Sequence, residues 1–270
     1  MAHSLEGQLY FTTPILAPHL RDWAAMKAAD HVIILDTWSW SRKGRSHRMA
    51  VNVQGQKQWL GLQGEPTQWK GKTIQGLQWE KETIDSMTKT WFKSLEPSYK
   101  SGYGFDELWP EWLNFWHQAP HTLVECTLEH GVWMAQWLGL QELSQKWLLA
   151  SALEDRVFQE AWFRVDVWME PKTAAYAPQP PNRTPLPTWT EPRYRQRWEP
   201  YVEDCSGLDL LFELGPESWR IIDKLCRQVQ KTPRYLLMHW QYSLPWLQSM
   251  SRSRPQSRPG QRWSPLNRQV

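Results

Sequence analysis

Cysteine is scarce in this sequence, and the few cysteines do not cluster. Cys126, Cys205 and Cys226 are widely separated in a chain of 270 residues, and no CxxC pair occurs. A disulfide-stapled domain and a cysteine-bound zinc site both need paired thiols, so neither is expected. The sparse cysteines fit a reducing compartment, and we predict a cytoplasmic protein.

Long hydrophobic runs are also absent. No apolar stretch approaches the roughly 20 residues that a membrane-spanning helix requires, so we predict no membrane span. The sequence begins MAHSLEGQLYFTTPILAPHL, in which no basic segment precedes an apolar one, and no signal peptide is expected.

Neither a large excess of one charge nor a common catalytic signature is present. The formal net charge of +3 is small for a nucleic-acid binder, so nucleic acid is not an expected partner. The motifs GxGxxG, GxxxxGK[ST], HExxH and GxSxG do not occur, and no cofactor is indicated. His117 and His121 have the spacing of helical metal ligands, but Pro120 would interrupt that helix, so no metal site is predicted.

Tryptophan, in contrast, is abundant. There are 21 tryptophans against 8 tyrosines and 7 phenylalanines, and they are spread from Trp23 to Trp263. Most fall on apolar positions of helical patterns, which favours indoles that replace other large side chains in an ordinary core. The alternative is a set of stacking platforms for bases or sugars.

The first 62 residues predict an α/β fold. A strand is expected over Gln8–Thr12, a helix over residues 17–29 and a strand buried on both faces within HVIILDT. The segment MAVNVQGQKQWLGL predicts a β-hairpin around Gly55. We predict a single mixed-sheet domain, flanked by helices, over residues 5–240.

The rest of the chain is mainly helical in pattern. Helices are predicted within residues 81–116, interrupted at PSYKSGYGF, and over TLVECTLEHGVWMAQWLGL, Trp147–Phe158 and Leu208–Gln230. Residues 177–192 contain six prolines, which predicts an extended connector. Residues 246–270 are rich in arginine and proline and contain no acidic residue, so a disordered basic tail is expected.

Four cations follow the predicted buried strand. Arg42, Lys43, Arg45 and Arg48 lie within DTWSWSRKGRSHRMAV, directly after HVIIL. Ligands of α/β proteins bind outside the carboxyl ends of the strands, where Asp36 would lie as a general base. Arginine and lysine at that position are suited to phosphate or carboxylate. The alternative is a solvated basic loop without a ligand.

Several segments, in order, resemble the WbqC-like family. These segments are TTPILAPHLRDWAAMKAADHVIILD, SRKGRSHRMAV, WFKSLEPSYKSGYGFDEL, DVWMEPK and RYRQRWEPYVEDCSGLDLLFELGPES. Together they cover about residues 8–223, and the last of them is the most specific. Where the family has asparagine, this chain has His47 and Glu213.

The resemblance implies a protein of bacterial surface-polysaccharide synthesis of the O-antigen type. We expect a transferase whose small anionic substrate is a nucleotide-linked or phosphorylated sugar. The candidate catalytic residues are Asp36 and Asp209. The candidate substrate-binding residues are Arg42, Lys43, Arg45, His47, Arg48, Lys172, Tyr194 and Gln196. The alternative is a non-catalytic nucleic-acid-binding protein that uses tryptophan stacking and the arginine-rich tail.

Overall fold

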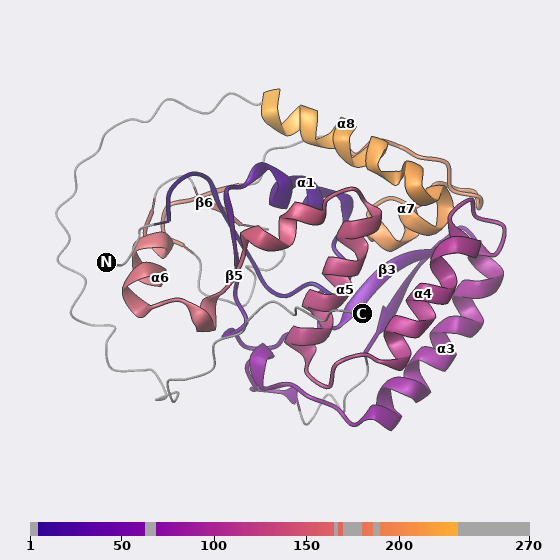
Figure 1. Ribbon diagram of the computed structural model, residues 1–270, viewed down its shortest axis with the longest axis horizontal. Helices are drawn as coiled ribbons and strands as arrows, with labels where there is room; N and C mark the ends of the chain where they lie inside the picture. Colours follow the sequence, from indigo (N-terminus) through magenta and orange to yellow (C-terminus); the bar gives the residue numbers. More distant parts are fainter. Residues whose placement is uncertain (1–4, 63–68, 165–166, 170–179, 186–189, 232–270) are drawn as a thin grey trace. The chain divides into compact units, whose positions relative to one another are not determined.

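The computed structural model describes residues 5–62, 69–164, 167–169, 180–185 and 190–231 (Figure 1). Its main sheet has five parallel strands in the order β5-β2-β1-β6-β7. The strands are β1 (Leu9–Thr12), β2 (His31–Ile34), β5 (Trp147–Leu149), β6 (Val167–Met169) and β7 (Arg183–Pro185). The strand predicted within HVIILDT is therefore an inner strand, β2, as its uninterrupted apolar run indicates.

Alternate residues of the inner strands pack on opposite faces of this sheet. Tyr10, Val32 and Ile34 join the larger core, whereas Phe11 and Ile33 join a smaller core. Both faces of β1 and β2 are therefore buried, as expected of strands in a parallel sheet.

Helices account for most of the remaining described residues. They are α1 (Leu20–Ala28), α3 (Lys81–Tyr99), α4 (Phe105–His117), α5 (Leu123–Trp137), α6 (Asp155–Trp162), α7 (Gly207–Leu214) and α8 (Ser218–Lys231). Short 3-10 helices cover Ile74–Gly76, Gln141–Lys146, Ala150–Ala152 and Gly215–Glu217. Helix α1 packs on α8, and α7 packs on α4 and α5. The smaller core includes Phe158, Ala161 and Trp162 of α6.

The predicted hairpin forms a second, two-stranded antiparallel sheet. Strands β3 (Arg48–Val53) and β4 (Gln56–Gly61) are joined by Gln54 and Gly55, which have positive φ angles of 52° and 81°. Positive φ at both central positions is the requirement of a type I′ turn, whose twist matches that of the strands. Strand β3 packs against α3 and α7.

The α/β prediction is confirmed, with the parallel and antiparallel strands in two separate sheets. The helix predicted over Trp147–Phe158 is wrong, because this segment forms β5, a 3-10 turn and only the first half of α6. Within the proline-rich segment, β7 pairs with one neighbour and is an edge strand, a position that tolerates proline.

The described residues end at Lys231, before the predicted end of the domain. All described elements belong to one compact unit, Met1–Thr232. The expectation of a disordered tail at residues 246–270 falls outside the described residues, and the domain limits 5–240 stay a prediction. No helix in the described ranges combines the length and the apolar character that crossing a bilayer demands.

Many of the tryptophans belong to the core. The indoles of Trp23, Trp112 and Trp116 are essentially inaccessible, and those of Trp69, Trp79 and Trp91 are buried. Trp91, Trp112 and Trp116 make edge-to-face contacts with one another or with Phe92. In the described part of the chain, packing therefore accounts for most of the tryptophan enrichment.

Candidate functional site

Asp36 lies at the carboxyl end of β2, as predicted, but its carboxylate is capped by the neighbouring loop. It is only 2% exposed, and Ser151, which follows β5, donates to it from both the backbone nitrogen (3.0 Å to Oδ1) and the hydroxyl. Burial raises the pKa of Asp36, and the two hydrogen bonds from Ser151 oppose the rise. The carboxylate is therefore held by protein donors.

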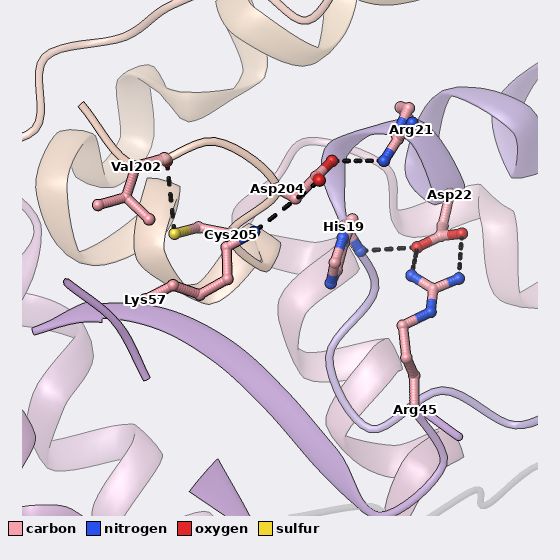
Figure 2. A network of polar contacts seen from close by, with 8 residues as sticks. All are labelled: His19, Arg21, Asp22, Arg45, Lys57, Val202, Asp204 and Cys205. Carbon is pink, nitrogen blue, oxygen red and sulfur yellow. Dashed lines mark hydrogen bonds and ion pairs between the residues drawn. The ribbon is translucent and has the colours of Figure 1, made fainter. Parts of the chain in front are cut away.

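Arg45 forms a buried ion pair with Asp22 of α1. Nη1 and Nη2 of Arg45 both donate to the carboxylate, with 2.9 Å between Nη2 and Oδ1 (Figure 2). The backbone nitrogen of His19 also donates to Oδ2, at 2.8 Å. Burial alone would raise the pKa of Asp22, but the Arg45 guanidinium and His19 together outweigh it and hold the pKa below its usual range. This bidentate pair joins the loop after β2 to the start of α1.

Arg48 and His47 are also engaged within the protein. Arg48 donates to the backbone carbonyls of Gly44 (3.0 Å) and Lys43 (2.6 Å), and its guanidinium lies 4.3 Å from the centre of the Trp59 ring. His47 accepts a hydrogen bond from Trp40 Nε1 at 3.2 Å. Burial, aided by Arg48, lowers the pKa of His47 to about 4, so this imidazole is neutral at pH 7.

Of the remaining predicted cations, two belong to the described residues. Arg42 and Lys43 are exposed. Lys172 lies outside the described residues. No ion pair in the described part of the chain joins Asp36 to the loop cations. The substrate-binding role of these residues stays a prediction.

Asp209, Tyr194 and Gln196, in contrast, lie together. The Asp209 carboxylate accepts hydrogen bonds from the hydroxyls of Tyr99 and Tyr194, from the backbone nitrogen of Asn52 (2.9 Å) and from Gln196 Nε2 (3.2 Å). Gln196 Oε1 in turn accepts from Asn52 Nδ2 at 3.1 Å. These five residues form a polar network that joins α7, α3 and β3.

The network is buried, which indicates a structural role. Asp209, Asn52 and Tyr99 have no exposed surface, and Tyr194 and Gln196 are 6% and 7% exposed. Burial raises the pKa of Asp209, while the donated hydrogen bonds oppose the rise. A carboxylate with this many protein donors fixes the positions of its neighbours.

Glu213, one of the two departures from the family pattern, has a structural contact of its own. Its Oε1 accepts the backbone N–H of Arg197 at 3.1 Å, and its Oε2 lies 3.6 Å from Arg197 Nη2. The glutamate therefore holds the segment that carries Gln196.

A cavity of about 590 Å3 lies beside this network, and we call it the Glu191 cavity. That volume is typical of small-molecule sites. Its lining residues are Arg21, Thr190, Glu191, Pro192, Arg193, Tyr201, Glu203, Asp204, Lys224 and Gln228. They come from α1, α8 and the two segments on either side of the Tyr194–Gln196 pair. None of the residues predicted from the sequence lines this cavity.

Charged groups of both signs surround the Glu191 cavity. Asp204 pairs with Arg21 and lies 3.8 Å from Lys57 of β4 (Figure 2). Arg193 lies 3.7 Å from Glu203 and places its guanidinium 5.2 Å from the centre of the Tyr201 ring. The cavity therefore offers contacts to anionic and to cationic groups of a ligand.

Glu191 has a raised proton affinity. Burial, followed by the negative charges of Asp204 and Glu203, raises its pKa to about 7, and Arg21 and Lys57 oppose the rise. A carboxyl group with this pKa exchanges a proton near neutral pH, which is the property of a general acid or base.

Two contacts connect the cavity to its surroundings. The ring of Tyr201 meets Tyr194 edge to face at 5.8 Å, so the buried Asp209 network supports the cavity wall. Gln228 of α8 holds the backbone of Thr190 by two hydrogen bonds of 3.1 Å, one to its nitrogen and one to its oxygen. Glu191 therefore follows directly after a residue, Thr190, whose backbone is held by α8.

A cysteine nucleophile is not supported. Cys126, Cys205 and Cys226 are buried and free, and burial raises the pKa of each thiol, that of Cys226 to about 11. Buried thiols of this kind stay protonated and unreactive. Within the described ranges, no three His, Cys, Asp or Glu side chains are placed to hold a metal ion.

The sequence contained one indication of the cavity. Arg193, Tyr201, Glu203 and Asp204 all lie in RYRQRWEPYVEDCSG, within the segment with the most specific resemblance. Glu191 precedes that segment, and Arg21 and Lys224 are distant in sequence, so no local pattern joins them.

Comparison with known proteins agrees with the resemblance. Residues 14–175, more than half of the chain, match the sequence profile of the WbqC-like protein family. Comparisons with curated proteins and with solved structures find no match. The match begins just after β1 and includes α1, β2, the basic loop and the β3–β4 hairpin. The chain belongs to the WbqC-like protein family.

Proposed function

We propose that this protein acts in bacterial surface-polysaccharide synthesis as a transferase, and that its nucleotide-linked or phosphorylated sugar binds in the Glu191 cavity. Family membership supports the process. The reaction class rests on the cavity itself, where three cations from separate parts of the chain surround a proton-exchanging carboxyl group.

Arg193 and Lys224 are the proposed phosphate contacts. Both line the cavity and are exposed, so a ligand can reach them. The Arg193–Glu203 pair is long at 3.7 Å, and both side chains are more than 70% exposed, so a phosphate can compete with it at little cost. Arg21, in contrast, is already paired with Asp204 and would shape the wall.

Glu191 is the proposed general base. A transferase must remove a proton from the acceptor hydroxyl or amine as the bond to the transferred group forms and the bond to the leaving group breaks. A carboxylate with a pKa of about 7 accepts that proton more readily than an ordinary glutamate. Asp36, the base predicted from the sequence, is capped by Ser151 and lies at the end of β2, outside this cavity.

A ligand screen tests the proposal. Sugar 1-phosphates and sugar nucleotides are titrated while the melting temperature is followed, and a ligand at 100 times its dissociation constant stabilises the fold by about 2.7 kcal/mol. Arg193→Gln combined with Lys224→Gln should weaken binding at least tenfold. Arg220→Gln, a change at an exposed arginine paired with Glu217, is the matched control and should leave binding unchanged.

Two results would contradict the proposal. If no sugar phosphate or sugar nucleotide stabilises the protein, the cavity has another ligand. The second result is a sugar that loses affinity in the Arg42→Gln and Lys43→Gln variant and keeps it in the Arg193→Gln and Lys224→Gln variant. In that case the substrate binds at the basic loop predicted from the sequence.

A further inference from the structure

The Glu191 cavity is lined by acids as well as cations, and its acids are unequally neutralised. Asp204 has Arg21 and Lys57 as partners, and Glu203 has Arg193. For Glu191, no ion pair occurs with any cation in the described part of the chain. A largely buried carboxylate without a cation is costly, because burial disfavours its charged form.

The surroundings of Glu191 show what would relieve this cost. Asp204 and Glu203 act on it with negative charge, and Arg21 of α1 and Lys57 of β4 act on it with positive charge. Tyr201, whose pKa is raised by burial and by Glu191, is a neutral phenol at this wall. A ligand cation placed beside Glu191 would interact favourably with three carboxylates.

The other side of the cavity has the opposite preference. Arg193 and Lys224 line it and are exposed, and they suit a phosphate group. A phosphorylated sugar that carries a protonated amine has both charges in one molecule, whereas a sugar phosphate without an amine would bring no cation to Glu191.

We infer that the sugar is an amino sugar, whose ammonium group lies against Glu191 and Asp204 while its phosphate lies against Arg193 and Lys224. This inference rests on the proposed function, because it specifies the substrate class of the same cavity. The ammonium group would supply the ion-pair partner that Glu191 lacks among the described residues.

Three sugar phosphates that differ at one ring position test the inference, and two of them, the amine and the hydroxyl, are nearly equal in size. Glucosamine 1-phosphate, N-acetylglucosamine 1-phosphate and glucose 1-phosphate, and the three corresponding uridine diphosphate sugars, are titrated calorimetrically into the full-length protein at pH 7.5. The free amine should bind at least tenfold more tightly than either neutral sugar. The ratio should shrink towards one at pH 5.5, where Glu191 is protonated and the ammonium group is still charged.

A pair of isosteric variants locates the preference. Glu191→Gln should remove the amine preference and leave the affinity for glucose 1-phosphate within about a factor of two. Glu217→Gln, at an exposed acid outside the cavity, should preserve it. The pH comparison uses the unaltered protein and therefore holds even if the Glu191→Gln variant does not fold.

The outcomes distinguish failure of the amino-sugar inference from failure of the proposed function. Equal binding of all three sugars, or tighter binding of a neutral one, overturns the amino-sugar inference and leaves the proposed function standing. A preference that persists in Glu191→Gln or at pH 5.5 also overturns it. Binding of none of the six compounds overturns the proposed function, and the inference with it.

Discussion

Arg45 and Arg48 stand three residues apart in the basic loop, and their surroundings predict different consequences of mutation. The Arg45 side chain is 11% exposed and that of its partner Asp22 is 2% exposed. Arg45→Gln leaves a buried carboxylate without its cation, so the free energy of unfolding should fall by about 3–5 kcal/mol. Urea denaturation at pH 7 measures this difference.

The neighbouring arginines provide the controls for that measurement. Arg48→Gln removes hydrogen bonds to two backbone carbonyls and a contact with Trp59, which should cost about 1–2 kcal/mol. Arg42→Gln, at an exposed position, should change stability by less than about 0.5 kcal/mol. Equal losses for Arg45 and Arg42 would mean that the Asp22 pair contributes nothing.

Glu191 predicts a specific dependence of stability on pH. Its pKa is about 7 in the folded protein and close to 4.5 in the unfolded chain, so between these values the folded state binds more protons. The contribution of this group to stability is therefore fully present below pH 4.5 and is lost as the pH rises to 7. When the pH is raised from 5 to 8, the free energy of unfolding of Glu191→Gln should increase by about 1–3 kcal/mol relative to that of the unaltered protein.

The comparison of two variants isolates this effect from all other titrating groups. The free energy of unfolding is measured at pH 5 and pH 8 for the unaltered protein, Glu191→Gln and Glu217→Gln. The difference in free energy of unfolding between variant and unaltered protein should change between pH 5 and pH 8 for Glu191→Gln, and it should stay constant for Glu217→Gln. A difference that is the same at both pH values would mean that Glu191 has an ordinary pKa.

At the scale of single residues, the sequence indicates some of the side chains that interact, but it does not indicate their partners. The predicted site residues Tyr194, Gln196 and Asp209 lie in one network, but they contact one another and Asn52 within the interior. Arg45 was grouped with its neighbouring cations, yet its partner Asp22 lies 23 residues earlier in the chain. Sequence spacing identifies charge, whereas the fold decides which charges are buried together.

At the scale of elements, the contact between α4 and α7 depends on two glycines. A Cβ atom on Gly104 would lie 2.3 Å from the Cα of Gly215 and from the carbonyl oxygen of Leu211. Gly215 itself has a φ of +56°, which disfavours other residues. Gly104→Ala should therefore lower the free energy of unfolding by about 3 kcal/mol, because backbone must move to admit the methyl group.

Thermal and urea denaturation of this variant test the close approach. Gly76→Ala is the control, since its Cβ would meet only Thr73 Oγ1 at 3.4 Å, and it should cost less than about 1 kcal/mol. If Gly104→Ala is as mild as Gly76→Ala, the two backbones are not in contact in solution.

Prediction of elements succeeded where the local pattern was distinctive and failed at one short strand. The wide apolar face of residues 122–140 predicted α5, and the alternation around Gly55 predicted the hairpin. The segment Trp147–Phe158 has an apolar pattern that fits a helix, but Trp147–Leu149 pairs with β2 and is an edge strand of three residues. Such a strand is stabilised by its partner, which local sequence does not contain.

At the scale of the whole molecule, the Glu191 cavity could not be predicted because its walls are distant in sequence. Arg21 and Lys224 lie more than 200 residues apart and meet because α1 packs on α8. The α/β class followed from local patterns, but the pairing of α1 with α8 depends on the complete topology. The predicted site was placed on strand ends, a general rule that does not identify which loops enclose a cavity.

The last prediction separates the cavity from the arginine-rich tail. Residues 246–270 contain five arginines and no acidic residue, so their removal reverses the sign of the formal net charge of +3. Any affinity of the full-length chain for single-stranded DNA should be lost with these residues, and before their removal it should fall steeply between 50 and 200 mM salt. Binding of glucosamine 1-phosphate should stay within a factor of two, because all lining residues of the cavity lie between Arg21 and Gln228. Fluorescence anisotropy with an oligonucleotide and calorimetry with the sugar phosphate measure the two affinities. DNA binding that persists in the truncated chain would instead favour stacking on exposed tryptophans such as Trp59 and Trp219.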